Sequence, residues 1–426
     1  MKTVGDRERF GSHLGLERIE LVCAALGNPQ YASKFIHVAG TSGKGSVSAF
    51  IAGVLKHSGL KVGLFTSPHL EEYAERFQID GRPIDQDTLA AVVTQAEAAC
   101  LAVEEEHPEL GKVTEFERAT AAAFLFFQQA QADVVVLETG LGGRLDATNV
   151  VHPLLTVITT VHLDHEDRLG STVEEIAWEK GGIIKEGVPL VSGVKVPEAN
   201  GVLKELASAK GAPWHSTQDV PWVGHGWCLD GGSLTYPGLG EVQIGLLGDH
   251  QLENAATALS ALMELRKLGY NLPSFAIYQG MKEVFWPGRL EVVRPSPLLI
   301  LDGAHNQEGL AALARSLQQL QERVTSQPFT IVFGMMQNKR LELLDPLLPV
   351  AQRFIFTAAQ SGRLAPLDPE VLRDYVQSRG GEAVAYPDLD QALEDAARSN
   401  PVCVCGSLYL VGEVKRLLHS RSGITG

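Results

Sequence analysis

The chain has 426 residues, of which 45% are hydrophobic and 20% are charged, a balance typical of a globular enzyme with two domains. The formal net charge of −15 argues against non-specific nucleic-acid binding, which needs a basic surface. No apolar run reaches the length of a membrane span, and the first ten residues lack the core of a signal peptide. Five widely spread cysteines indicate reduced thiols, so we expect a cytoplasmic protein without membrane partners.

Strand-like and helix-like segments alternate through the first half of the chain. A buried strand is predicted over residues 34–40, followed by a helix that begins at Ser46 and ends at Gly59, because apolar residues recur at helical spacing. Further strands are predicted at residues 61–67, 133–138, 156–161 and 188–193, with helices at 89–105 and 119–130. This alternation predicts an α/β fold with a mostly parallel sheet covered on both faces.

The composition changes between residues 210 and 245, where glycine, proline and aromatic residues surround short strand-like runs. We interpret this segment as a small antiparallel β insertion, followed by a helix over residues 254–269. The segment from Arg294 to Pro297 (RPSP) is a candidate stiff linker.

Four more buried strands are predicted after the candidate linker, at residues 298–302, 329–334, 353–358 and 402–406. In the last of these, Cys403 and Cys405 alternate as on one face of a strand, without the spacing of a metal pair. We therefore expect a larger P-loop-type α/β domain at residues 1–296 and a smaller Rossmann-like α/β domain at residues 297–426.

The loop between the first strand and the first helix has the features of a phosphate-binding site. It consists of Gly40, Thr41, Ser42, Gly43, Lys44, Gly45 and Ser46. It departs from the usual G-x-x-x-x-G-K-[ST] pattern, because two residues instead of four separate its first glycines and a glycine stands between lysine and serine. Free N–H groups and the helix dipole favour an anion at this position, while the lysine suits β and γ phosphates and the serine hydroxyl suits Mg²⁺. The alternatives are a plain glycine-rich turn and, less well supported, a dinucleotide site.

Motifs spread over nearly the whole chain resemble the folylpolyglutamate synthase/dihydrofolate synthase family of the Mur ligase superfamily. They are LGLERI at residue 14, GTSGKGS at 40, TSPHL at 66, TEFE at 114, ETGLGGRLDATN at 138, HLDHEDRLGSTVEEIAWEKGGIIK at 162, GDHQLENAATAL at 248, WPGRLE at 286, LDGAHN at 301 and GSLYLVGEV at 406. The resemblance implies an ATP-dependent ligase that phosphorylates the carboxylate of a pterin-type substrate and couples it to L-glutamate. Dihydropteroate, reduced folate polyglutamates or both fit as substrates, and the family implies a monomer.

The resemblance also implies a magnesium site on Ser46, Glu138 and His165, with two ions in all. Glu138 ends the buried run DVVVL, where a carboxylate without a cation would be costly. His165 follows the strand predicted at 156–161, but Mg²⁺ prefers oxygen ligands, so chemistry alone leaves a solvent-exposed histidine as an equal alternative.

Lys180 is predicted to point inward from a helix that starts with a capping box at Ser171 and Glu174. It lies three and four residues beyond the apolar Ala177 and Ile176, so it shares their face, and burial there would lower the pKa of its amine. The alternative is a lysine in water near the helix C-terminus. The resemblance implies carbamylation of Lys180 by CO₂, a carbamate that assists the second Mg²⁺, and catalytic roles for Lys44, His165 and Lys180.

The remaining site residues are implied by the resemblance. The ATP contacts beyond the loop are Asn254, Arg289, Asp302 and His305. Asn254 could instead cap the helix that follows, and Arg289 could be an ordinary exposed arginine. The expected substrate contacts are Ser67, Pro68, His69, Thr114, Phe116, Glu117, Leu145, Asp146 and Ala147. Because Asp302 and His305 belong to the second domain, the two domains must meet to complete the site.

Two segments of the second domain depart from the family pattern, at Gln337–Arg340 and at Ser361–Arg363. Lys339 and Arg363 remain available for an anionic glutamate chain. Two other functions stay open at this point: another Mur-type amide ligase, and a P-loop nucleotide-binding regulator without ligase activity.

Overall fold

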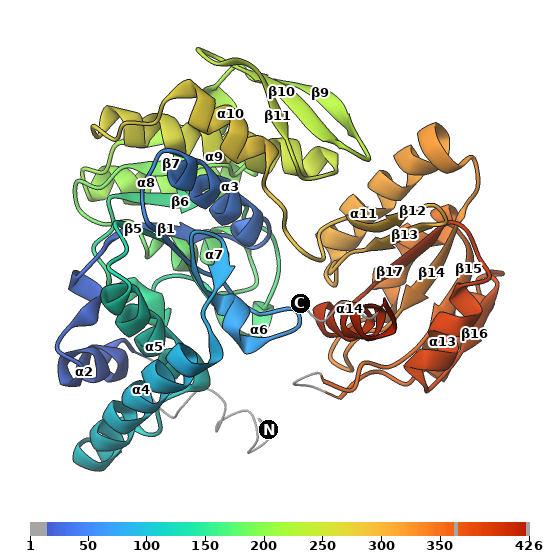
Figure 1. The fold of residues 1–426 in the computed structure, drawn as a ribbon, viewed down its shortest axis with the longest axis horizontal. Helices are drawn as coiled ribbons and strands as arrows, with labels where there is room; N and C mark the ends of the chain where they lie inside the picture. The colour runs from blue at the N-terminus through green and yellow to red at the C-terminus, as the bar shows by residue number, and fades with distance from the viewer. Residues whose placement is uncertain (1–14, 362–364, 423–426) are drawn as a thin grey trace.

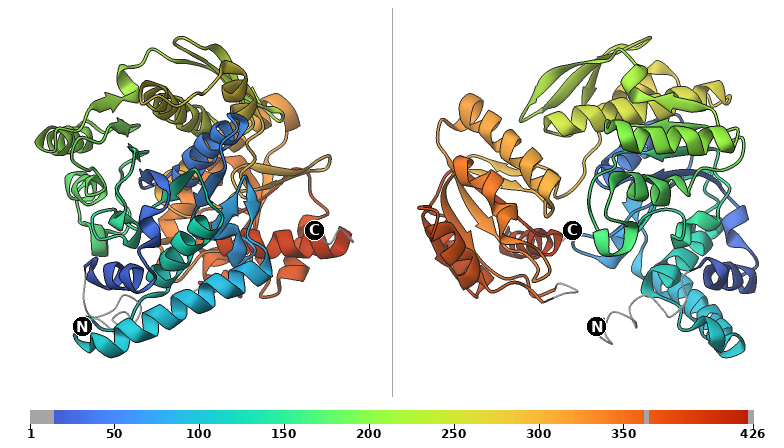
Figure 2. Two further views of the ribbon diagram at one scale, coloured as in Figure 1. Left: turned by 60° about the vertical axis from the view of Figure 1, so that its left-hand side comes forward. Right: turned by 180° about the vertical axis from the view of Figure 1, so that it is seen from behind.

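The computed structural model describes residues 15–361 and 365–422 and contains two α/β units, each built around its own sheet. Figure 1 shows the larger, N-terminal unit beside the smaller, C-terminal one, with a separate three-stranded sheet above the first. The right-hand view of Figure 2 shows the same two units from behind. The predicted α/β class is confirmed.

The first sheet has eight strands in the order β4-β3-β2-β5-β1-β6-β7-β8, and only β3 runs antiparallel to its neighbours β2 and β4. The strands are β1 Lys34–Ala39, β2 Val62–Phe65, β3 Phe77–Ile79, β4 Arg82–Pro83, β5 Val134–Glu138, β6 Leu155–Ile158, β7 Leu190–Ser192 and β8 Trp214–Ser216. Alternate residues of β1 enter different cores: Ile36 packs on one face of the sheet and Phe35 on the other. This double burial explains why the strand reads as a continuous apolar run.

Helices cover both faces of this sheet. They are α2 Glu17–Ala25, α3 Lys44–His57, α4 Gln86–Glu106, α5 Glu115–Gln129, α6 Glu166–Leu169, α7 Val173–Gly181, α8 Pro197–Ala209, α9 Asp249–Lys267 and α10 Ser274–Lys282. The cluster of α3, α9 and α10 packs on one face, while α2, α4 and α5 pack on the other. Short helical turns are η1 Pro29–Tyr31, η2 Tyr73–Arg76, η3 Pro108–Leu110, η4 Ala147–Val150, η5 Thr217–Asp219, η6 Gln321–Thr325 and η7 Leu341–Val350.

The predicted antiparallel insertion is present as the three-stranded sheet β9 Val223–Cys228, β10 Gly231–Tyr236 and β11 Gly240–Ile244. Its first part is different from the prediction, because β8 lies within residues 210–245 and pairs in parallel with β7 of the main sheet. Only the residues from β9 onward form the separate sheet.

The second unit has a six-stranded sheet in the order β12-β13-β17-β14-β15-β16, parallel except for β12. Its strands are β12 Glu291–Pro295, β13 Leu298–Leu301, β14 Phe329–Phe333, β15 Ala351–Phe356, β16 Ala383–Ala385 and β17 Val402–Cys405. Its helices are α11 Gln307–Leu320, α12 Pro369–Gln377, α13 Leu389–Ala396 and α14 Leu408–Ser422. The interpretation of Arg294–Pro297 as a linker is wrong, because these residues end β12 and turn into β13. The domain bounds 1–296 and 297–426 stay a prediction.

The fold shows where the cysteines lie and how long and apolar the helices are. All five cysteines are free thiols, and Cys403 and Cys405 are buried in β17. Across the described ranges, every helix is too short or too polar to cross a membrane.

Candidate active site

The predicted site residues converge because their strands are neighbours. β1 lies between β5 and β6, and all three run parallel, so the segments that follow them meet at one edge of the sheet. This edge holds the Gly40–Ser46 loop after β1, Glu138 at the end of β5 and the segment 159–165 after β6. Ligand sites in parallel α/β sheets lie at this carboxyl edge.

Two side chains from distant parts of the chain pack directly on the glycines of the loop. Gly43 has φ 82° and precedes α3, and a Cβ on it would lie 2.4 Å from Asn254 Oδ1. A Cβ on Gly45 would lie 2.9 Å from Trp286 Nε1. Glycine is therefore required by backbone conformation at Gly43 and by close approach at both positions.

Asn254 lies at the loop as expected and does not cap a helix. α9 begins five residues earlier, at Asp249, and Asn254 donates from Nδ2 to Gln251 Oε1 at 2.9 Å. The capping alternative is wrong.

The loop is anchored on the residues after β6. Thr159 Oγ1 and Thr160 Oγ1 lie 2.6 and 3.0 Å from the Ser42 carbonyl oxygen, and Ser42 N–H donates to Thr160 Oγ1 at 2.9 Å. Thr41 N–H donates to the Thr160 carbonyl at 2.9 Å. The amides of Thr41 and Ser42 therefore shape the loop, whereas the first amides of α3, at Lys44 and the residues after it, have no intrahelical acceptor and suit an anion.

Glu138 is a buried carboxylate beside a lysine. Its Oε1 lies 3.8 Å from Lys44 Nζ, which also donates to the Gly40 carbonyl at 3.2 Å. Burial raises the pKa of Glu138 to about 7, although Lys44, Arg289 and the N–H of Ser67 favour the carboxylate. A nearby cation stabilises the ionised form of a carboxylate that is desolvated in this way. Together with the Ser46 hydroxyl at the same sheet edge, Glu138 offers the oxygen donors that Mg²⁺ prefers.

His165 stands at the rim of this site. It has a left-handed backbone with φ 51°, and 53% of its side chain is exposed. Partial burial, with the cations Lys339 and Lys44, lowers its pKa although Asp164 opposes them. A neutral imidazole with Lys44 nearby has the ligand chemistry predicted for it. Among residues 15–361 and 365–422, no group of three or more His, Cys, Asp and Glu side chains could hold a metal, and the magnesium site stays a prediction.

Lys180 points inward, as the helical spacing predicted. It is 3% exposed and follows the fully buried Ile176 and Ala177 on α7. Burial, reinforced by Lys44, lowers its pKa to about 7, while Asp164 and Asp146 oppose the shift. A substantial fraction of neutral amine is therefore present at neutral pH, which is the form that reacts with CO₂.

The capping box of α7 lies one residue later than predicted. Thr172 Oγ1 accepts from Glu175 N–H at 3.2 Å, and Glu175 Oε2 accepts from Thr172 N–H at 3.3 Å. The same Glu175 oxygen accepts from Ser171 N–H at 2.7 Å, so Ser171 and Glu174 are not the pair.

The two most specific motifs, GLGGRLDATN and EKGGIIK, lie against each other in the fold, with their backbones in contact. A Cβ on Gly143 would lie 2.7 Å from the Lys180 carbonyl, and one on Gly182 would lie 2.3 Å from Arg144 Cβ. Arg144 N–H donates to the Glu179 carbonyl at 2.8 Å. This contact fixes the loop after β5 against the end of α7 and sets the position of Lys180.

Replacing Gly182 by alanine should therefore destabilise the protein by roughly 2 kcal/mol, through overpacking against Arg144. Gly182 has φ −61° and ψ −16°, so the effect is steric and not conformational. Urea unfolding measures it. The matched control is Gly201→Ala on α8, where no atom lies within 4 Å, and which should stabilise the helix by ~0.5–1 kcal/mol. Equal stabilities of the two variants would contradict the close contact.

Two of the expected substrate residues, Asp146 and Ala147, have side chains that contact other parts of the protein. Asp146 Oδ2 accepts from Leu141 N–H at 2.8 Å and Oδ1 from Thr148 N–H at 3.1 Å, and burial raises its pKa. Ala147 is buried in the core formed with α2, α4 and α5, whereas Leu145 is half-buried.

The TEFE residues begin α5. Thr114 caps the helix, accepting from Glu117 N–H at 3.2 Å, and the helix therefore starts four residues before the predicted 119. Glu117 is buried and pairs with Arg18 at 3.1 Å. The ring of Phe116 lies where a Cβ on Gly140 would come within 2.6 Å, so it contacts the loop after β5.

Ser67, Pro68 and His69 follow β2, next to β5. The backbone of Ser67 lies near Glu138 and favours its ionised form, which places this segment beside the site. His69 Nδ1 accepts from Arg76 Nε at 3.0 Å.

The second unit contributes side chains at the same place. Arg289 lies near Glu138 and Asp302, whose carboxylate accepts from Leu290 N–H at 2.7 Å and Ala304 N–H at 2.8 Å. Burial raises the pKa of Asp302 despite Arg289. His305 Nδ1 lies 2.8 Å from the Gly303 carbonyl, and burial lowers the pKa of this imidazole.

Several residues at the site were not singled out from the sequence. Asn306 Nδ2 donates to Asp164 Oδ2 at 3.1 Å, a contact between the two units. His250, in the first turn of α9, has its pKa lowered to about 4 by burial, with Arg289 and Arg315 adding to the shift. The only sequence signal for these site residues is their position in or beside the motifs named above, as for Asp164, His250, Asn306 and Trp286.

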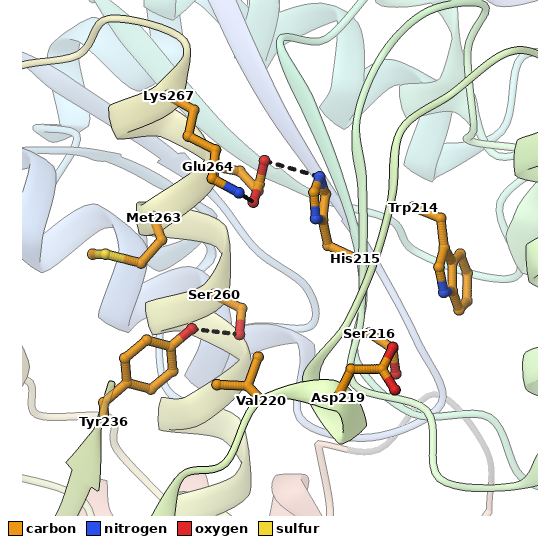
Figure 3. Close-up of a pocket in the computed structure, with 10 residues that line it drawn as sticks. All are labelled: Trp214, His215, Ser216, Asp219, Val220, Tyr236, Ser260, Met263, Glu264 and Lys267. Atoms are coloured by element: carbon orange, nitrogen blue, oxygen red, sulfur yellow. Dashed lines mark hydrogen bonds and ion pairs between the residues drawn. The ribbon is translucent and has the colours of Figure 1, made fainter. Parts of the chain in front are cut away.

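A pocket of about 250 Å³ lies away from these residues, between β8, β10 and α9 (Figure 3). It is lined by Trp214, His215, Ser216, Asp219, Val220, Tyr236, Ser260, Met263, Glu264 and Lys267. Within it, Glu264 pairs with His215 at 2.9 Å and Lys267 at 2.6 Å. None of the predicted site residues lines it. Arg363, Gly362, His13 and Leu14 lie outside the described residues.

Known proteins similar to this chain are named as dihydrofolate synthases, folylpolyglutamate synthases or both. Residues 291–417 match the family described as "Dihydrofolate synthetase, C-terminal domain". A dihydrofolate synthase/folylpolyglutamate synthase of Bacillus subtilis is 37% identical over 97% of this chain and 96% of its own length. A dihydrofolate synthetase of Saccharomyces cerevisiae is 34% identical, over 96% and 98%.

Solved structures agree with the sequence relatives. A folylpolyglutamate synthase of Thermotoga maritima superposes with a TM-score of 0.85 at 34% identity, covering 97% of this chain and 95% of that one. A folylpolyglutamate synthase of Mycobacterium tuberculosis complexed with ADP has a TM-score of 0.87 at 30% identity, over 96% and 95%.

Proposed function

Because the chain belongs to the folylpolyglutamate synthase and dihydrofolate synthase family, we propose that it joins L-glutamate to the carboxylate of a pterin or folate substrate, driven by conversion of ATP to ADP and phosphate. The observation that supports this most is the meeting of the Gly40–Ser46 loop, Glu138 and Lys180 at one sheet edge. A site that only binds a nucleotide has no need of the buried Lys180 near the carboxylates of Asp146 and Asp164.

The reaction has two steps. A carboxylate oxygen of the pterin substrate attacks the γ-phosphorus of ATP, the bond to the β-phosphate oxygen breaks, and ADP leaves. The neutral amine of glutamate then attacks the acyl carbon, and phosphate leaves with the electron pair of the C–O bond. The amine loses a proton in this step, so the amide product is neutral at nitrogen.

Lys44 and the first amides of α3 hold the phosphates, because a helix N-terminus and an ammonium both stabilise negative charge that develops on the γ-phosphoryl group. Ser46, Glu138 and His165 would hold Mg²⁺, which supplies neutralisation of phosphate charge when bound. Glu138, with its pKa raised to about 7, ionises fully when a cation joins Lys44 beside it.

Lys180 is the residue that we propose to be carbamylated, and its carbamate would serve the second metal ion. Its amine, with a pKa lowered to about 7, attacks CO₂ to form an N–C bond and releases a proton, which gives an anion in place of a cation. The carbamate would assist a second Mg²⁺, and Asp146 and Asp164 lie close enough to Lys180 to influence its pKa.

The second unit completes the nucleotide site through Arg289, Asp302, His305 and the contact of Asn306 with Asp164. The substrate residues are Ser67, Pro68, His69, Thr114, Phe116, Glu117, Leu145, Asp146 and Ala147. Ala147 and Glu117 act through the shape of the site, since their side chains are occupied in the core and with Arg18. We place the enzyme in the cytoplasm as a monomer.

The test is ADP release by the purified protein with L-glutamate and either dihydropteroate or tetrahydrofolate. Release that depends on glutamate together with at least one pterin is the expected result, and comparison of the two pterins assigns the substrate. ATP turnover that ignores glutamate with both pterins would instead favour a nucleotide-binding regulator.

A further inference from the structure

The segment that follows β2, residues 66–72, is held from both sides, and we call it the β2–η2 loop. On its inner side the backbone of Ser67 lies close enough to Glu138 to favour the ionised carboxylate. The carboxylate of Glu75 accepts three successive N–H groups, from Leu70 at 2.7 Å, Glu71 at 2.8 Å and Glu72 at 2.7 Å. These bonds tie residues 70–72 to η2, three residues from Ser67.

On its outer side the β2–η2 loop lies against α14 of the second unit. A Cβ on Gly412 would lie 2.0 Å from the Leu70 carbonyl oxygen, and the Leu70 side chain packs on the apolar core of the second unit. Glu71 Oε1 lies 3.9 Å from Lys415 Nζ, and the Glu71 carbonyl accepts from Arg416 Nη1 at 3.1 Å. This contact joins residues more than 300 positions apart in the sequence.

Lys415 is itself fixed within the second unit. Its Nζ lies 2.9 and 3.2 Å from the two carboxylate oxygens of Glu291, and Glu291 Oε2 accepts from Gly288 N–H at 2.8 Å. Their side chains are 11% and 7% exposed, respectively, for Lys415 and Glu291. A desolvated pair of this kind holds its geometry, so Glu71 meets a cation whose position follows the chain segment that joins the two units.

We propose that Glu71 and Lys415 are positioning residues that couple the placement of the second unit to the β2–η2 loop, and through Ser67 to Glu138. This inference rests on the proposed function. When the second unit is seated, the loop is drawn against α14, and Ser67 and His69 take their places at the site. The pterin substrate therefore binds to a loop whose shape depends on the second unit.

Glu71→Gln is the direct test, because Lys415 keeps its partner Glu291. Loss of about 1 kcal/mol of charge-assisted contact predicts a roughly fivefold rise in the KM for the pterin substrate, with the KM for ATP changed less than about twofold. Gly412→Ala displaces the loop by another route and should give the same split. Lys415→Arg, which keeps the charge that faces Glu71 and Glu291, should stay near wild type.

Exposed Glu105 on α4 supplies the matched control, since Glu105→Gln makes the same charge change without touching the second unit. Wild-type kinetics in both Glu71→Gln and Gly412→Ala would overturn the coupling. Amide hydrogen exchange of residues 66–72 needs no turnover, and it should be faster in both variants than in wild type. A protein without glutamate-dependent turnover, yet with this difference in exchange, would refute the proposed function and keep the coupling.

Discussion

Glu138→Gln is expected to lower kcat by about 10²–10⁴-fold while the fold persists, because phosphoryl transfer depends on charge placed beside the phosphates. Glutamine keeps the size and one oxygen of the side chain, so the loss isolates the negative charge. Lys44→Ala should have an effect of the same order, since Lys44 lies 3.8 Å from Glu138 and stands at the start of α3. Steady-state ADP release measures both.

Glu138→Gln should lower kcat, but it should raise the free energy of unfolding of the protein without metal or nucleotide. The pKa of Glu138 is raised from 4.5 to about 7 in the folded protein, so the folded state binds more protons between these values and stability falls as pH rises through this range. Without metal or nucleotide at pH 8, the glutamine variant should be more stable than wild type by about 1–3 kcal/mol. Addition of Mg²⁺ and ATP should stabilise wild type preferentially.

Lys56→Ala, on the exposed side of the same helix α3, is the matched control for Lys44 and should leave kcat unchanged. Retained turnover in Glu138→Gln or Lys44→Ala would contradict the placement of the phosphates at this sheet edge.

Lys180→Met is expected to lower kcat by about 10²-fold or more while stabilising the apo protein. The folded pKa of about 7 lies below the ordinary 10.5, so the unfolded state binds more protons between these values. Wild-type stability should therefore rise with pH from about 7 toward 10.5, because the penalty for the buried ammonium is present in full only below this range. At pH 7, removal of the amine should raise the free energy of unfolding by ~1–3 kcal/mol.

Carbamylation is measured directly by ¹³C NMR with labelled bicarbonate. Wild type should show a carbamate carbonyl signal that grows with pH through 7, and Lys180→Met should lack it. Lys204→Met on α8, an exposed lysine, should keep the signal, kcat and stability of wild type. An unmodified amine at saturating bicarbonate and Mg²⁺ would overturn the assignment.

Local patterns determined much of the architecture. The alternation of strands and helices and the inward direction of Lys180 follow from periods of 2 and 3.6 residues, and the antiparallel insertion follows from local composition. Both signals depend on neighbours in sequence only. The same reasoning failed where local signals were ambiguous. Ser171 and Thr172 both precede a glutamate at capping distance, and only the packing of α7 selected Thr172. Prolines suggested a linker at Arg294–Pro297, yet β12 is an edge strand, where proline is tolerated.

Reactive residues could be identified from local patterns alone: a lysine in a glycine loop, a carboxylate after a buried strand and a lysine on an apolar helix face. The surroundings of these residues depend on how distant segments pack. The burial that shifts the pKa of Glu138 and Lys180, the approach of Asn254 and Trp286 to the loop, and the contact of Glu71 with Lys415 all join segments distant in sequence. Desolvation and close contact are properties of neighbours in space, and strand order creates those neighbours.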